Sequence, residues 1–201
     1  MQDLFVTLKP YFLFLHAIGF IVGLGSAIVA DTLFFRFLKD LRISKEEEYI
    51  LSYVGRLVII GLIVLLISGI GIFLSDPVKY LASSKFLTKM AIVVVIAING
   101  FLLHRYLAPR LTLIEWDKGA HAKNRRARKM AAALGAVSST SWFSALLLGY
   151  LRSIPFTFGQ AFWCYILLLL CAIGVSQILE NYFARQMDHV FEVFDPFKDN
   201  E

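Results

Sequence analysis

Several ionisable side chains lie within long apolar stretches of the sequence, where they can do chemistry that water would suppress. His16 and Asp31 stand in the first such stretch, residues 10–34, and Lys89 stands near the start of a later one, residues 87–108. An ionisable group inside a membrane span is costly unless it is paired or faces a cavity. Imidazole is a common metal ligand, and intramembrane carboxylates line ion and proton paths. These residues are therefore the first candidates for a functional site.

The composition explains why apolar sequence surrounds these groups. Of 201 residues, 58% are apolar and 17% are charged, and the charged share of an ordinary soluble domain is about 25%. The mean hydropathy is +0.69. Such a chain is neither disordered nor a coiled coil, and the composition argues against a soluble enzyme. The net charge is +5. Its basic residues lie mainly in the loops between apolar stretches, where they indicate the orientation of a membrane protein, so no nucleic-acid partner is expected.

Five stretches are long and apolar enough to be membrane spans. They lie near residues 10–34, 54–75, 87–108, 131–151 and 158–182. The sequence therefore predicts an all-α integral membrane protein, with a four-helix-bundle core plus a fifth span. We expect a single transmembrane domain over residues 1–182, followed by an amphipathic cytoplasmic tail over residues 183–201.

Proline and capping residues mark several helix ends. Pro10 is expected in the first turn of the first helix, and Asp76-Pro77 is expected to close the second span. The segment Ser44-Lys45-Glu46-Glu47 has the form of a capping box, so the second helix is expected to begin before its span.

Basic residues predict the orientation. Most Lys and Arg residues fall in segments 36–56 and 105–129 and in the tail, which lie on one side of the membrane if there are five spans. The positive-inside rule places that side in the cytoplasm and the N-terminus outside, in a bacterial-type cytoplasmic membrane. The basic loop 118–129 is expected to face anionic lipid headgroups.

His16 and Lys89 are predicted to act together. By the rise of an α-helix, His16 lies roughly 9 Å below the outer end of its span and Lys89 roughly 3 Å below that of its own, and a lysine side chain can bridge the difference. Gly19 and Gly23 share the helical face of His16. Small residues let a second backbone or a flat cofactor come close. The alternative is a packing stripe, with the histidine bonded to a neighbouring helix.

A second polar cluster is predicted near the cytoplasmic edge. His104 lies roughly 25 Å down its span, too deep to share one metal ion with His16. Four further residues are expected at or near this level: Asp31, Arg36, Asn99 and Glu180. Ion pairs between the acids and the nearby arginines are the favoured interpretation of this cluster. The alternative is a path for protons or ions.

Other residues carry weaker signals. His121 and His189 stand beside Asp117 and Asp188, which suggests either a metal site or, more simply, solvated loops. Cys164 and Cys171 are seven positions apart in one span, too far for a disulfide on a helix. A homo-oligomer would use small-residue stripes such as Gly61 with Ser68.

The order of these motifs resembles a known family. His16 is followed by Gly23-Leu24-Gly25 and by "LFFRF", and the third span reads "KFLTKMAIVVVIAINGFLLHRY" before the basic segment "KNRRARKM". Over residues 10–152 this arrangement is similar to that of the HemJ-type protoporphyrinogen oxidases and the related copper-resistance-D-like (CopD-like) membrane proteins. The resemblance implies haem b, with His16 as ligand of the haem iron and Lys89 as its partner.

Two functions are therefore expected as alternatives. The first is a b-type haem-binding membrane redox protein, an oxidoreductase whose substrate would be a porphyrinogen-like ring. The second is a membrane conduit for protons or metal ions, copper being the family analogy, that uses Asp31, His104 and Glu180.

Overall fold

The computed structural model describes residues 2–39, 45–107 and 121–193. Every described element is helical: α1 (Gln2–Lys39), α2 (Lys45–Ser75), α3 (Pro77–Leu81), α4 (Ser84–Leu102), the π-helix η1 (Leu103–Leu107), α6 (His121–Tyr150) and α7 (Phe158–Val193). Five of them, counting α4 with η1, are long and apolar enough to cross a membrane. The five predicted spans are thus confirmed as helices of the required length and composition.

The first helix begins earlier than the sequence analysis placed it. Pro10 lies inside α1, which starts at Gln2, so the prediction that Pro10 stands in its first turn is wrong. Asp3 lies in the true first turn, where its charge suits the helix dipole, and the Thr7 hydroxyl donates to the carbonyl of Asp3 over 3.0 Å. Proline keeps a helical φ and costs one hydrogen bond, and here the helix continues past it.

The turn after α2 holds a short helix that was not predicted. α2 ends at Ser75, as Asp76-Pro77 indicated, but Pro77 then opens α3. The Asp76 carboxylate accepts a hydrogen bond from the backbone N–H of Lys79 over 3.2 Å and caps this helix. At the other predicted cap, α2 begins at Lys45, directly after Ser44, which itself lies outside the described residues.

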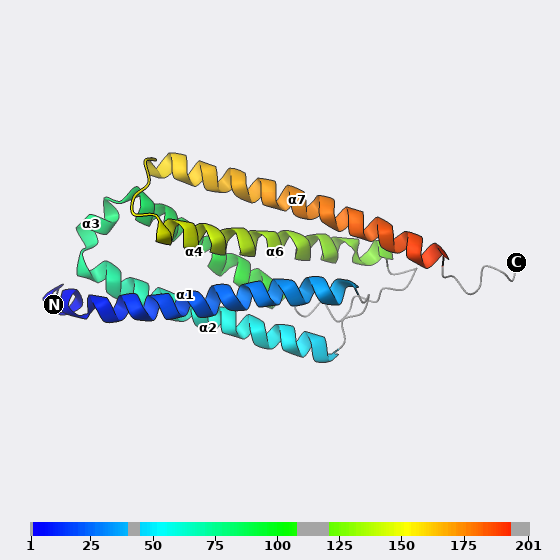
Figure 1. The fold of residues 1–201 in the computed structure, drawn as a ribbon, viewed down its shortest axis with the longest axis horizontal. Coiled ribbons are helices and arrows are strands. Elements are labelled where there is room, and N and C mark those ends of the chain that lie inside the picture. Colours follow the sequence, from blue (N-terminus) through cyan, green and yellow to red (C-terminus); the bar gives the residue numbers. More distant parts are fainter. Residues whose placement is uncertain (1, 40–44, 108–120, 194–201) are drawn as a thin grey trace, which may run out of the picture.

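The helices pack in two groups. Figure 1 shows α1 beside α2, and α4, α6 and α7 in a second group. The two groups meet through α1 with α6 and through α2 with α4. We call the end at which α1 and α4 begin the Lys89 end, and the end at which α1 stops and α2 begins the Asp31 end. α7 packs on α6 and α4 and continues beyond residue 182 without a break, so the predicted tail starts as an extension of the fifth span.

Glycines bring the backbones of α1 and α2 into contact. A Cβ atom at Gly61 would lie 2.6 Å from the Cα atom of Gly23, and one at Gly19 would lie 2.8 Å from the backbone nitrogen of Leu65. A Cβ at Gly23 would also strike the ring of Trp142 from α6. The small-residue face of α1 is therefore filled by a second helix and by an indole ring, as the packing alternative anticipated.

A buried cluster joins the two groups of helices. Trp142 is 1% exposed and packs edge-on against Phe20, with ring centroids 5.7 Å apart. Around it lie other buried side chains, among them Leu65, Ile92, Ile96 and Leu169. Long apolar side chains elsewhere are exposed, including Trp163, Leu167 and Leu170 on α7. Such an exposed apolar surface suits contact with lipid.

Gly61→Ala tests the contact between α1 and α2. The new methyl group would overlap the Gly23 backbone, and overpacking of this kind costs about 1–3 kcal/mol, so we expect a lower midpoint of thermal unfolding in detergent. Gly174→Ala is the matched control, because a Cβ there meets no atom within 4 Å. Equal midpoints for the two variants would contradict a backbone contact at Gly61.

Candidate functional site

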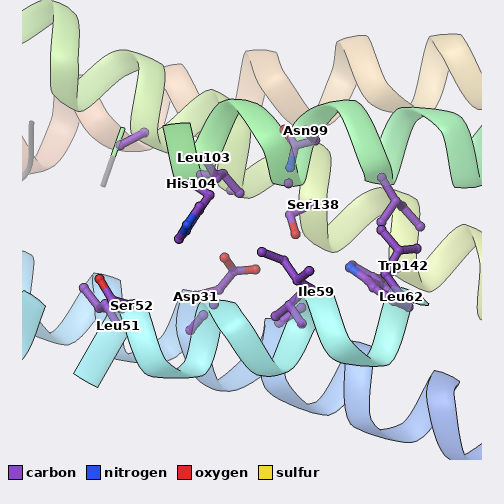
Figure 2. A pocket seen from close by; sticks show the side chains of 18 of the residues that line it. Asp31, Leu51, Ser52, Ile59, Leu62, Asn99, Leu103, His104, Ser138 and Trp142 are labelled. Carbon is purple, nitrogen blue, oxygen red and sulfur yellow. The ribbon is translucent and has the colours of Figure 1, made fainter. Parts of the chain in front are cut away.

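A cavity of about 160 Å³ lies at the Asp31 end, between the two groups of helices. Side chains from α1, α2, α4, η1 and α6 line it (Figure 2). Most of the lining is apolar, and Leu62, Ile96 and Trp142 are examples. The polar side chains that line it are Asp31, Glu48, Ser52, Asn99, His104 and Ser138. The cavity therefore combines an apolar wall with a small number of polar groups, as ligand sites commonly do.

Asp31 brings the carboxylate of α1 into this cavity. Its Oδ2 atom accepts a hydrogen bond from the hydroxyl of Ser139 on α6. Gly135 of α6 lies beside the other oxygen, since a Cβ there would lie 3.7 Å from Oδ1, an ordinary contact distance. Among the described residues Ser139 is the one hydrogen-bond partner of Asp31, and no arginine pairs with it. A carboxylate within an apolar span thus keeps an oxygen free for a ligand.

Asn99 also lines this cavity and has an unsatisfied oxygen. Its side chain is 4% exposed, and its Nδ2 donates to the carbonyl of Leu134 over 3.1 Å. Its Oδ1 is buried without a hydrogen-bond partner. Buried polar atoms are nearly always satisfied, so an exception needs an explanation. This oxygen is itself buried, so it offers no direct contact to a ligand in the cavity.

His104 faces Asp31 across the cavity. Figure 2 shows the imidazole and the carboxylate reaching into the same space from opposite helices. His104 lies in η1, and such π-helical turns occur frequently at functional sites. Three residues of the predicted inner cluster, Asp31, Asn99 and His104, therefore line one cavity.

Glu180 and Arg36 do not line that cavity. Glu180 Oε1 lies 2.9 Å from Nε of Arg128, and the two side chains are 10% and 7% exposed. This ion pair joins α7 to α6, away from Asp31. The sequence placed other arginines near Glu180 and missed Arg128, while Arg36 is exposed near the end of α1. The predicted cluster is thus divided between a cavity and a buried ion pair.

His16 is bonded to the neighbouring helix at the other end of the bundle. Its Nδ1 lies 3.1 Å from Oγ of Ser68, which is fully buried on α2. Ser68 donates its one hydroxyl proton to the carbonyl of Val64 over 2.7 Å, so the network assigns the donor role to Nδ1–H of His16. The lone pair of the neutral imidazole then lies on Nε2, which can accept a proton or ligate a metal.

Lys89 lies in the first turns of α4, at the same end of the bundle as His16 (Figure 1). Its Nζ lies 3.7 Å from the position that a Cβ at Gly149 would take. The two residues that the sequence paired therefore stand at the same end, but neither lines the cavity.

The remaining sequence candidates give no site in the described part of the chain. The side chains of His121 and His189 and most of the basic segment 118–129 lie outside it. Within it, no three His, Cys, Asp or Glu residues are placed to hold a metal ion. Cys164 and Cys171 are free and exposed.

Several serines of the polar network were not predicted. Ser139 bonds to Asp31, Ser68 bonds to His16, and Ser141 bonds to the hydroxyl of Tyr165 over 2.8 Å. The signal in the sequence is the polar stretch 138–141 within an apolar span, since hydroxyls there must find partners.

No protein-family model matches the chain, and no curated protein or solved structure is significantly similar to it. The resemblance to HemJ-type and copper-resistance-D-like proteins therefore stays a prediction from sequence.

Arg128→Ala tests the ion pair on α7. Removal of the guanidinium leaves a buried carboxylate at Glu180, and breaking a buried pair in this way costs about 3–5 kcal/mol. We expect a large drop in the midpoint of thermal unfolding. Arg56→Ala, at an exposed position of α2, should change it little. Similar small losses in both variants would show that the pair contributes no more than a surface charge.

Proposed function

We propose that this protein is a membrane conduit for protons or other small cations, and that the Asp31 carboxylate in the cavity receives them. The observation that carries the proposal is the position of Asp31, which lies in an apolar span beside a cavity and has Ser139 as its partner among the described residues. A carboxylate at such a position favours a proton or a cation, because either one removes the cost of the buried charge.

The orientation expected from the basic residues supports uptake from the cytoplasm. The positive-inside rule assigns the Asp31 end to that side. Glu48 and Ser52 line the cavity near the start of α2 and add polar groups there. A cation would pass these groups before it reaches Asp31.

Beyond the cavity the proposed path has a barrier and further polar groups. Trp142 lines the cavity and sits on Gly23, so passage requires its indole ring to move. The Ser141–Tyr165 pair lies between α6 and α7 at the level of Trp142, and the Ser68–His16 pair lies further towards the Lys89 end. Asp31 and His16 are about 22 Å apart along α1 by the helical rise. His16 Nε2 is the base that such a path would reach next.

Protons suit these groups better than metal ions do. A structural or transport metal site needs several ligands from His, Cys or carboxylates. The described residues include no group of three such side chains. A proton needs one acceptor at a time, and Asp31 and His16 each supply one.

Asp31→Asn tests the conduit. In proteoliposomes with a pH-sensitive dye inside, we expect wild-type protein to dissipate an imposed pH gradient and Asp31→Asn to slow it by about tenfold or more, since the amide carries no charge. Asp76→Asn is the control, because asparagine also caps a helix and Asp76 lies at the opposite end. Equal rates in wild type and Asp31→Asn, or no flux above empty liposomes, would refute this function.

A second candidate function rests on the tautomer of His16. With Nδ1–H bonded to Ser68, Nε2 is the atom that would ligate the iron of haem b, and Lys89 would serve as its partner. Bound haem would supply one-electron redox chemistry, as an oxidoreductase acting on a porphyrinogen-like substrate requires. The Gly19–Gly23 face does not fit a macrocycle, however, because α2 and Trp142 fill it. The cation conduit is therefore the better supported of the two.

The absorption spectrum separates the two candidates. If His16 holds haem, protein purified from haem-replete cells shows a Soret band that His16→Ala abolishes, because the iron loses its ligand. His104→Ala should keep the band, since His104 lies at the other end of the bundle. Colourless wild-type protein eliminates the redox candidate, and loss of the band in His104→Ala alone would refute the assignment to His16.

A further inference from the structure

We propose that the cavity beside Asp31 is a binding site for a small organic ammonium ion, a primary amine attached to an apolar body about the size of a benzene ring. The inference rests on the proposed function in one respect, because the same carboxylate receives the positive charge. It goes further by assigning the ligand a size, a shape and a set of hydrogen-bond donors.

The size of the cavity indicates an organic ligand. Its volume is about 160 Å³, and an apolar protein cavity of roughly 150 Å³ binds benzene. Two of its lining residues, Gly55 and Gly100, add open space, because a Cβ at either would meet no atom within 4 Å. A proton or a bare metal ion would leave most of this volume empty.

The polar and apolar parts of the lining are separated. Figure 2 shows Trp142 and Leu62 together towards one end of the cavity and His104 with Asp31 towards the other. A ligand with an apolar body and a charged head fits this order. The body would pack against the indole of Trp142, and aromatic pairs of this kind are favourable.

One acceptor faces this space without a matching donor among the described residues. Asp31 accepts one hydrogen bond, on Oδ2, and its Oδ1 is left without a donor in the described part of the chain. An ammonium group offers three N–H donors, a positive charge and no acceptor. It can donate to Asp31 Oδ1 and compensate the charge of the carboxylate, whereas an anion would be repelled by Asp31 and an alcohol carries no charge.

The test compares two ligands of nearly the same shape. Benzylamine carries the ammonium group, and benzyl alcohol replaces it with a neutral hydroxyl. Calorimetric titration of the full chain in lipid nanodiscs, with empty nanodiscs subtracted, should show benzylamine binding about tenfold or more tightly than the alcohol. Hydrogen bonds to a charged group are stronger than neutral ones by about this factor.

Two variants probe the two parts of the site. Asp31→Asn should weaken benzylamine binding by about tenfold or more and bring it close to that of the alcohol. Gly100→Leu keeps the carboxylate but fills the cavity, so it should abolish binding of both ligands. Gly174→Leu is its control, because that glycine on α7 is equally open and lies outside the cavity lining. Gly100→Leu also decides the question if Asp31→Asn does not fold.

The outcomes separate this inference from the proposed function. Equal binding of amine and alcohol, or amine binding unchanged in both Asp31→Asn and Gly100→Leu, overturns the ammonium site. No amine binding together with proton flux that depends on Asp31 overturns the site and leaves the conduit. Amine binding that depends on Asp31 and Gly100, without such flux, supports the site and refutes the conduit.

Discussion

The backbone contact between α1 and α2 is the constraint on which the rest of the structure depends. Gly19, Gly23 and Gly61 carry no side chain that would hold the two helices apart, and packing at such short range supplies much of the attraction between helices in lipid. The gap beside Gly23 also receives Trp142, the centre of the buried cluster and one wall of the cavity. His16 and Asp31 lie on either side of this contact, so one helix sets the separation of the two polar regions.

Much of the fold could be predicted from the sequence because a bilayer restricts the choices. Five long apolar stretches can only be helices in lipid, and the structure has five such helices. The end of the second helix was predicted correctly from Asp76-Pro77, where a proline follows a polar residue. Pro10 was misread because a proline near a helix start is compatible both with the first turn and with a helix that begins earlier. The short helix α3 was missed because five residues give no periodicity.

The candidate site could be predicted only in part. The hydropathy pattern gives the depth of a residue along its span, but it does not give the direction in which its side chain points. Asp31, Asn99 and His104 were placed at one level of the bundle, and they line one cavity. Glu180 was expected at the same level, yet its side chain meets Arg128 on α6. Which face of a helix meets which neighbour depends on packing among all the helices. Likewise, no spacing rule joins Ser139 to Asp31 or Ser68 to His16, because these contacts arise only when separate helices dock.

The order of the helices along the chain also bears on how the protein is made. α1 and α2 are neighbours in sequence, so their glycine contact can form early in synthesis, when the ribosome has released little more than the first third of the chain. Trp142 and Ser139 belong to α6 and are synthesised much later. Until then the Asp31 carboxylate has neither its hydrogen-bond donor nor a cavity around it. Docking of α6 therefore completes the cavity, and a chain that ends before α6 would leave the Asp31 carboxylate without its hydrogen-bond donor.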